Sequence, residues 1–183
     1  MNWTIPGTTL TDKRENADHV EEMFHSMFLA GGMVLSQVSS ITGLEPYTIQ
    51  NWVKRGFLAP PRNKRYDLEQ VCRLITINML KGILPLEKIC SLMQYINGDL
   101  TDESDDIIND TDLYFMFVKL AARARHIGGN ENWEQAIENA MSTYTEPQPG
   151  AKSRVEKVLR TMLMAWIACR FKAQVDAMVD SLN

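Results

Sequence analysis

Hydrophobic residues recur along the chain mostly at three- and four-residue spacing, a pattern that predicts helices rather than strands. The pattern is interrupted by glycine, proline and short polar segments, which mark the helix ends. Residues 62–66 are too short for anything but a very short hairpin. The sequence therefore predicts an all-α fold, with helices over residues 12–29, 35–42, 46–55, 67–80, 85–98, 112–126, 131–144 and 152–182.

Residues 36–66 show the most specific order of elements: helix, glycine turn, helix, proline corner and basic loop. Gly43 suits the turn because glycine adopts a positive φ at little cost. Pro46 suits the first turn of the second helix, where its missing N–H would be unpaired in any case. Pro60 and Pro61 stop a helix and favour an extended path. This order is typical of a helix-turn-helix followed by a wing.

The second of these helices has two chemically different faces when it is drawn at 100° per residue. The inward face carries Ile49, Trp52, Val53 and Gly56, and Trp52 is expected in the core rather than as a stacking platform. Asn and Gln can pair with adenine edges, and Lys and Arg can reach guanine or phosphate. A recognition helix for the DNA major groove is therefore predicted over residues 46–55, with an outward face of Tyr47, Gln50, Asn51 and Lys54, flanked by Thr48 and Arg55.

Other residues in the same segment suit the DNA backbone. Ser36 and Thr48 lie near helix N-termini, where hydroxyl and backbone N–H groups favour phosphates. In the basic loop, three cations and a phenol follow the proline corner. The predicted phosphate contacts of the wing over residues 60–66 are Arg62, Lys64, Arg65 and Tyr66.

The charge of the chain is unevenly distributed. Nineteen Lys and Arg face twenty-three Asp and Glu, for a net charge of −4. Residues 34–97 hold eight Lys and Arg but four Asp and Glu, so this part carries +4 and the remainder −8. Such asymmetry points to a nucleic-acid surface on one part of the molecule only.

Several kinds of chemistry lack a signature in this sequence. Cys72, Cys90 and Cys169 are far apart, which argues against a disulfide framework or a zinc site. We find no nucleophile–base pairing and no phosphate-binding glycine loop, so neither an enzyme, a cofactor nor a metal is expected. The start lacks a secretory pattern, and the longest apolar run is far shorter than the ~20 residues that span a bilayer. A cytoplasmic protein without membrane contact is expected.

The acidic segment over residues 99–112 holds seven Asp and Glu and no base, and we interpret it as a solvated domain boundary. Three regions follow from it: an N-terminal helical arm over residues 1–32 that packs on the second half or on a partner subunit, a winged helix-turn-helix over 33–98, and a helical region over 99–183. In the middle region, Asp67 and Gln70 are expected to form a capping box. The last region, with its long terminal helix, is expected to form a homodimer and could bind a small-molecule or protein effector.

The middle region resembles the DNA-binding domain of the MerR family of bacterial regulators. The resemblance rests on Thr42-Gly43, Thr48-Ile49, Gly56-Phe57-Leu58, the basic loop over 62–66 and Leu86-Glu87-Lys88-Ile89. The whole chain also resembles an uncharacterised bacterial family, mostly from Firmicutes, known as a domain of unknown function with a MerR-like start. Gln50-Asn51-Trp52 replaces the MerR Arg-Tyr-Tyr, and the domain is not N-terminal. The resemblance thus implies the way of docking on DNA but not the MerR switch.

The expected function is that of a sequence-specific duplex-DNA-binding transcriptional regulator. Two alternatives remain open from the sequence. One is a phage-type excisionase or architectural DNA-binding protein that uses the same fold. The other is a protein-interaction adaptor whose winged domain has lost DNA binding, which the acidic remainder of the chain would equally suit.

Overall fold

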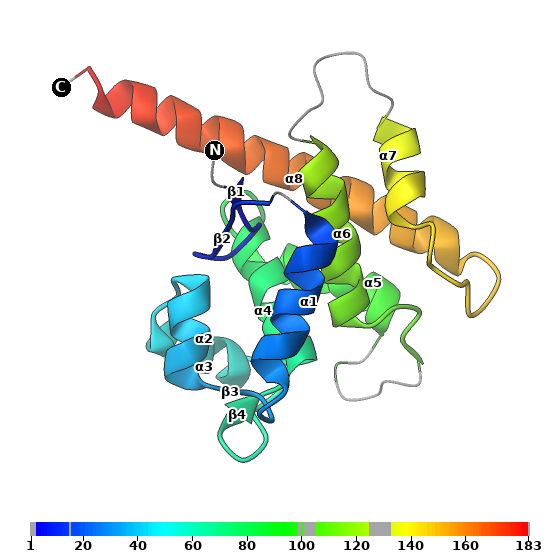
Figure 1. Ribbon diagram of the computed structural model, residues 1–183, viewed down its shortest axis with the longest axis horizontal. Helices are drawn as coiled ribbons and strands as arrows, with labels where there is room; N and C mark the ends of the chain where they lie inside the picture. Colours follow the sequence, from blue (N-terminus) through cyan, green and yellow to red (C-terminus); the bar gives the residue numbers. More distant parts are fainter. Residues whose placement is uncertain (1–2, 15, 99, 101–104, 125–132, 183) are drawn as a thin grey trace.

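The computed structural model describes residues 3–14, 16–98, 100, 105–124 and 133–182. Within these ranges the chain forms eight α-helices and four two-residue strands, which confirms the all-α class (Figure 1). The strands pair antiparallel as β1 (Trp3–Thr4) with β2 (Thr11–Asp12) and β3 (Met33–Val34) with β4 (Arg65–Tyr66). The helices are α1 (Ala17–Phe28), α2 (Leu35–Thr42), α3 (Pro46–Lys54), α4 (Leu68–Leu80), α5 (Leu86–Asn97), α6 (Asp110–Ala124), α7 (Trp133–Ala140) and α8 (Ala151–Asp180).

The first helix begins later than the hydrophobic pattern predicts. Asp12, expected to open it, lies in β2 instead. The side-chain oxygen of Asn16 accepts a hydrogen bond from the backbone N–H of Asp18 at 2.9 Å, which caps the start of α1. The apolar stripe itself is confirmed, because Val20 and Phe24 are fully buried and α1 packs against α6.

Helix α4 runs through the middle of the molecule and is buried along most of its length (Figure 1). It contacts α1, α2, α5, α6 and α8. Its start confirms the predicted capping box: Asp67 Oδ1 accepts from the Gln70 backbone N–H at 2.8 Å, and Gln70 Oε1 accepts from the Asp67 N–H at 3.1 Å. The capping box therefore defines where α4 begins. Helices from both halves of the chain pack on α4.

Loss of the cap oxygen is expected to destabilise the protein modestly. We expect Asp67→Ala to lower the free energy of unfolding by about 1 kcal/mol, because the Gln70 N–H loses its acceptor. Urea unfolding measures the change. Asp67→Asn is the matched control, since it keeps an acceptor oxygen and should remain within about 0.5 kcal/mol of wild type. Equal losses for both variants would contradict the capping role.

Helices from all three predicted regions share one hydrophobic core. Phe24 of α1 lies against the rings of Tyr114 and Phe115 of α6, with centroids 5.8 and 5.7 Å apart. The Tyr114 hydroxyl donates to the carbonyl of Pro6 at 3.0 Å. The N-terminal arm is thus attached to α6, while the boundaries 1–32, 33–98 and 99–183 stay a prediction.

The acidic segment over residues 99–112 differs from a solvated linker where the structure describes it. Ile107 and Ile108 are buried, and Asp110, which opens α6, is only 5% exposed. Asp99, Asp102 and Glu103 lie outside the described residues, as do residues 125–126, predicted to end this helix, and residue 131, predicted to begin the next. The burial of Asp110 makes it a structural residue rather than part of a linker.

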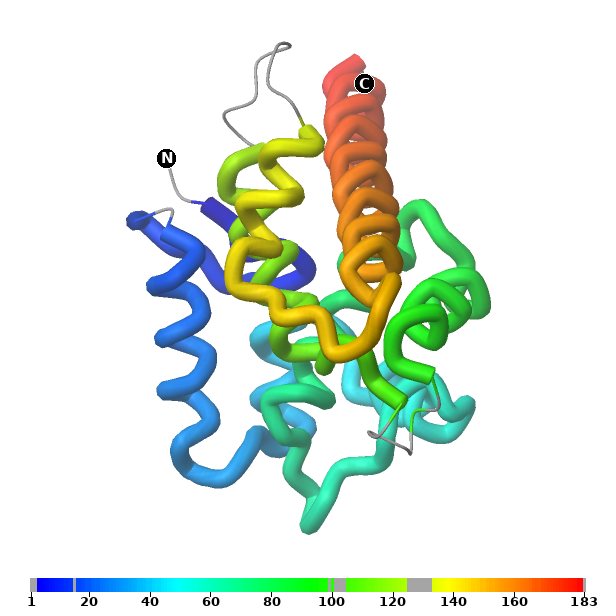
Figure 2. The backbone as a smooth tube through the Cα atoms, turned by 90° about the vertical axis from the view of Figure 1, so that its right-hand side faces the viewer, coloured from blue at the N-terminus to red at the C-terminus, as the bar shows by residue number. Residues whose placement is uncertain are grey.

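The terminal helix α8 is thirty residues long, and its C-terminal end extends past the body of the molecule (Figure 1; Figure 2). Its first half, through Trp166, packs against α4, α5, α6 and α7. Every described residue from 170 onward is exposed. The predicted cover of the apolar stripe is therefore found for the first half only. None of the described helices combines the length and apolarity that membrane crossing requires.

Candidate nucleic-acid interface

The turn between α2 and α3 is held by a glycine and by side-chain hydrogen bonds. Gly43 has a φ of +67° and ends α2, and its N–H donates to the Ser39 carbonyl at 2.9 Å. The Ser39 hydroxyl donates to the Leu44 carbonyl at 2.6 Å. The Asn78 side-chain amide donates to the Thr42 carbonyl at 2.9 Å. These bonds fix the turn and attach it to α4.

Helix α3 separates its faces as the helical period predicts. Ile49 is fully buried and Trp52 is 4% exposed, so Trp52 is a core residue. Tyr47 is 76% exposed, and Gln50 and Lys54 are also exposed. Two residues are less exposed than predicted. Thr48, predicted to flank this face, and Asn51, predicted to be part of it, are both half-buried. The outward face of α3 therefore offers amide, phenol and ammonium groups to a ligand.

The basic loop forms the predicted short hairpin. Arg62 and Arg65 form a β-bridge, and the Arg65 N–H donates to the Arg62 carbonyl at 2.9 Å. The two residues between them, Asn63 and Lys64, have φ values of 49° and 62°. Positive φ at both central residues is typical of a tight two-residue hairpin turn. The turn leaves Arg62, Lys64 and Arg65 exposed at its tip.

Tyr66 lies in the core, which contradicts the prediction that its hydroxyl contacts a phosphate. The residue is 3% exposed and pairs with Met33 of β3. Burial raises the pKa of its hydroxyl. Tyr66 therefore supports the hairpin from within the core, and we remove it from the candidate surface.

Two of the predicted backbone-contacting arginines already have partners within the protein. Arg55 Nη2 lies 2.9 Å from Glu87 Oε1, and its guanidinium lies 4.5 Å from the centroid of the Phe57 ring. Arg65 Nη1 donates to the Gly32 carbonyl at 2.8 Å. An exposed ion pair such as Arg55–Glu87 contributes only about 0–1 kcal/mol, and Arg65 is bonded to a neutral carbonyl, so a phosphate could compete for either guanidinium.

Helix α3 and the hairpin lie at the same end of the molecule. Helix α2 contacts α3, β3 and β4, and Figure 1 shows this end opposite α8. Ser36 is exposed in the first turn of α2. A polar helix face beside a cationic hairpin has the chemistry of base-edge and phosphate contacts.

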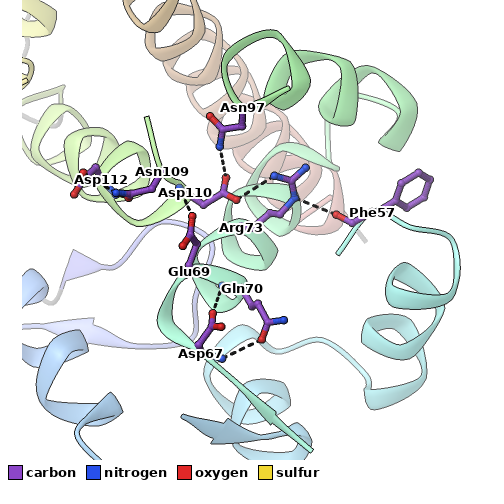
Figure 3. Close-up of polar contacts among 9 residues, drawn as sticks. All are labelled: Phe57, Asp67, Glu69, Gln70, Arg73, Asn97, Asn109, Asp110 and Asp112. Carbon is purple, nitrogen blue, oxygen red and sulfur yellow. Dashed lines mark hydrogen bonds and ion pairs between the residues drawn. The ribbon is translucent and has the colours of Figure 1, made fainter. Parts of the chain in front are cut away.

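A buried ion pair behind this surface was not anticipated. Arg73 and Asp110 are each 5% exposed, and Arg73 Nη1 lies 3.0 Å from Asp110 Oδ2 (Figure 3). The pair removes Arg73 from the surface charge, although the sequence count includes it in the basic region. Its signal in the sequence is a single charged residue within Val71–Ile77, a segment whose other members are apolar except Thr76. A charge in such a segment requires a buried partner.

Side chains of α4 also hold the chain that connects α3 to the hairpin. Arg73 Nε donates to the Phe57 carbonyl at 3.2 Å. Gln70 Nε2 donates to the carbonyls of Ala59 and Pro60 at 3.2 and 2.9 Å. The connection is therefore bonded to α4 over residues 57–60.

The other side of the ion pair is rich in acceptors. The Asn97 amide donates to Asp110 Oδ1 at 3.4 Å, and the Asp110 backbone N–H donates to Glu69 Oε1 at 3.3 Å (Figure 3). The pKa of Asp110 is raised because burial outweighs the stabilising effect of Arg73. Among the described residues, no three His, Cys, Asp or Glu side chains are grouped so that they could hold a metal ion.

Asp106, next to this cluster, should make stability depend on pH. Burial, and then the carboxylates of Asp110, Asp105 and Glu69, raise its pKa from 3.8 to about 6. A carboxyl group with a higher pKa in the folded state favours folding below the unfolded pKa, and loses this contribution as the pH rises through about 6. We therefore expect Asp106→Asn to stabilise the protein at neutral pH and to flatten its stability profile between about pH 4 and 6.

Urea unfolding at a series of pH values measures this effect. Asp180→Asn, at the exposed end of α8, is the matched control and should leave the profile unchanged. Parallel profiles for wild type and Asp106→Asn would show that Asp106 is not the titrating group.

The chain is similar to a family of bacterial proteins. Residues 17–117, which include α2, α3 and the hairpin, match the family described as Domain of unknown function (DUF1836). The chain is similar to "Uncharacterized protein YkrK" of Bacillus subtilis (strain 168), with 32% identity over 84 residues, 44% of this chain and 36% of the relative. It thus matches little more than a third of that relative's length. No solved structure matches the chain. The family match covers more than half of the chain, which therefore belongs to the bacterial family described as Domain of unknown function (DUF1836).

Proposed function

We propose that the protein is a sequence-specific duplex-DNA-binding transcriptional regulator with a MerR-like winged helix-turn-helix. Helices α2 and α3 would form the helix-turn-helix, and the hairpin over residues 62–66 would form the wing. The observation that carries the proposal is that helix α3, with exposed polar side chains, and the hairpin, with exposed cations, lie at one end of the molecule. Groove-reading proteins use the same two kinds of contact.

In the proposed complex, α3 lies in the major groove. Gln50 and Asn51 offer the amide groups that pair with adenine edges, and Lys54 can reach guanine or phosphate. Tyr47 and Thr48 lie toward the start of the helix. Predicted contacts to the DNA backbone come from Ser36, Arg55, Arg62, Lys64 and Arg65.

A second copy of the chain would complete the regulator. The exposed end of α8 carries an apolar stripe at helical spacing, formed by Phe171, Val175, Met178, Val179 and, just after the helix, Leu182. Pairing of this stripe between two copies would cover it and would present two α3 helices to DNA. Dimeric helix-turn-helix proteins bind two half-sites related by the two-fold axis of the protein.

A charge in the α8 stripe should separate such a dimer. We expect wild type to have the mass of a dimer in light scattering at micromolar concentration, and Val175→Asp to have the mass of a monomer, because a carboxylate would be desolvated in the interface. Ala173→Asp adds the same charge on the opposite side of α8 and is the matched control. A monomeric wild type, or a monomeric control, would contradict pairing through the stripe.

The decisive experiment for the proposal is the selection of protein-bound fragments from the source genome. Enrichment of a motif with two-fold symmetry would support a sequence-specific regulator. Binding without a motif, together with bending of the fragments, would favour the architectural alternative. A lack of enrichment over bulk DNA would favour the adaptor.

The adaptor reading has its own structural support. Arg55 is paired with Glu87, Arg65 is bonded to Gly32, and Arg73 is buried against Asp110. These contacts reduce the number of cations offered to DNA, and the remainder of the chain is acidic. The adaptor therefore remains the second candidate function, and the genomic selection distinguishes it from the regulator.

A further inference from the structure

A cavity of about 360 Å³ lies between the chain that leads into the hairpin and the start of α6. Part of its lining, formed by residues 58–61, is apolar. The polar part of the lining includes Asn97, Asp106 and Asp110, of which Asn97 and Asp110 are drawn in Figure 3. The volume falls at the lower end of the range for small-molecule sites in proteins.

Within the described ranges of the chain, two buried oxygen atoms of the polar lining find no hydrogen-bond donor. Asn97 is 4% exposed; its amide nitrogen donates to Asp110, and its Oδ1 has no partner among the described residues. The reverse orientation of the amide would place Oδ1 against the Asp110 carboxylate, where two acceptors repel. Asp106 Oδ1 is also buried and has no partner in the described part of the chain. Buried acceptors in native proteins normally find a donor, so the cavity lacks the donors that its wall requires.

The charge of the wall indicates the kind of donor. Four carboxylates and two guanidinium groups line the cavity, and one guanidinium, that of Arg73, is already paired with Asp110. The excess is negative, which favours a cation. The apolar residues 58–61 of the lining favour a cation that carries an alkyl group over a hydrated metal ion.

We propose that this cavity binds a small organic cation of the alkylguanidinium or alkylammonium class. The N–H groups of the ligand donate to Asn97 Oδ1 and Asp106 Oδ1, and its alkyl part lies against Pro60 and Pro61. The existence of this site does not rest on the proposed DNA binding. Its regulatory use rests on the proposed function, because the ligand would contact the chain that leads into the hairpin and would thereby act on the wing.

The binding test uses the full chain, labelled with ¹⁵N and without DNA. The probes are n-butylguanidinium and n-butylammonium, and n-butylurea is the neutral control of similar shape. We expect saturable shifts of the Asn97 side-chain amide and the Leu58 backbone amide for at least one cation. The expected Kd of the cation is about 1 mM or lower. It should be at least about tenfold lower than the Kd of n-butylurea.

Two variants locate the site. Asp106→Asn should weaken binding of the cation by about tenfold or more, because the charge is removed while the shape remains. Asp180→Asn, remote from the cavity, should bind as wild type does. Absence of saturable shifts, equal binding of n-butylurea, or unchanged binding by Asp106→Asn would overturn the proposal. Because DNA is absent from the titration, failure of the cation site leaves the proposed DNA function standing, and failure of DNA binding leaves the cation site standing.

Discussion

Replacement of Arg62 by Gln together with Lys64 by Asn is expected to weaken duplex DNA binding by about tenfold or more for every sequence tested. Both side chains are exposed at the hairpin, and the proposal assigns them to phosphates. Each lost phosphate contact removes the release of a condensed counterion, so the slope of log K against log salt should become shallower by about 1.8 for two contacts. Titrations at four or more salt concentrations measure both quantities.

The substitutions are chosen to preserve the hairpin. Lys64 has a φ of 62°, a conformation that Asn tolerates better than most residues, and Arg62 keeps a long polar side chain as Gln. Lys152→Gln together with Lys157→Gln removes two exposed cations from α8 and is the matched control, expected to keep the wild-type slope. An unchanged slope in the hairpin variant would remove the wing from the proposed interface.

Asp110→Ala is expected to lower the free energy of unfolding by about 3–5 kcal/mol. The substitution leaves the Arg73 guanidinium buried without its carboxylate, and a buried charge without a partner is among the costliest defects in a protein. It also removes the acceptor of the Asn97 amide. Urea unfolding measures the loss.

The second half of this experiment removes both charges. Arg73→Met combined with Asp110→Ala should regain more than half of the stability lost in Asp110→Ala alone, because the variant no longer leaves the Arg73 charge buried without its partner. The coupling between the two positions then follows from a double-mutant cycle. Additive losses in the double variant would show that the pair does not act as a unit.

Local patterns were sufficient to predict the parts of the fold that depend on neighbours in the sequence. The helical period identified the buried Ile49 and Trp52 of α3, and the spacing of Asp67 and Gln70 identified the capping box at the start of α4. These features depend on residues three to four positions apart. The outward face of α3 and the turn that precedes it could therefore be predicted from the sequence.

Features that depend on distant residues were not predictable in this way. Arg73 and Asp110 are thirty-seven positions apart, and no period connects them. Tyr66 is buried because β4 pairs with β3, whose Met33 lies far upstream and within a segment too short to identify as a strand. The predicted start of α1 was too early because Asp12 pairs with Trp3 in a short hairpin. In each case the local sequence favoured one environment for the residue, and tertiary packing placed it in a different one.

The bonds from Gln70 and Arg73 to the carbonyls of residues 57–60 have a thermodynamic consequence. Conformational entropy that a mobile loop loses when it binds a partner has already been lost here during folding. Calorimetry of the proposed complex should therefore give a heat-capacity change that reflects the contact area alone, without the larger negative value that accompanies coupled folding. The connection between α3 and the hairpin is ordered by these bonds within the protein itself, so the proposed complex would not need to order it.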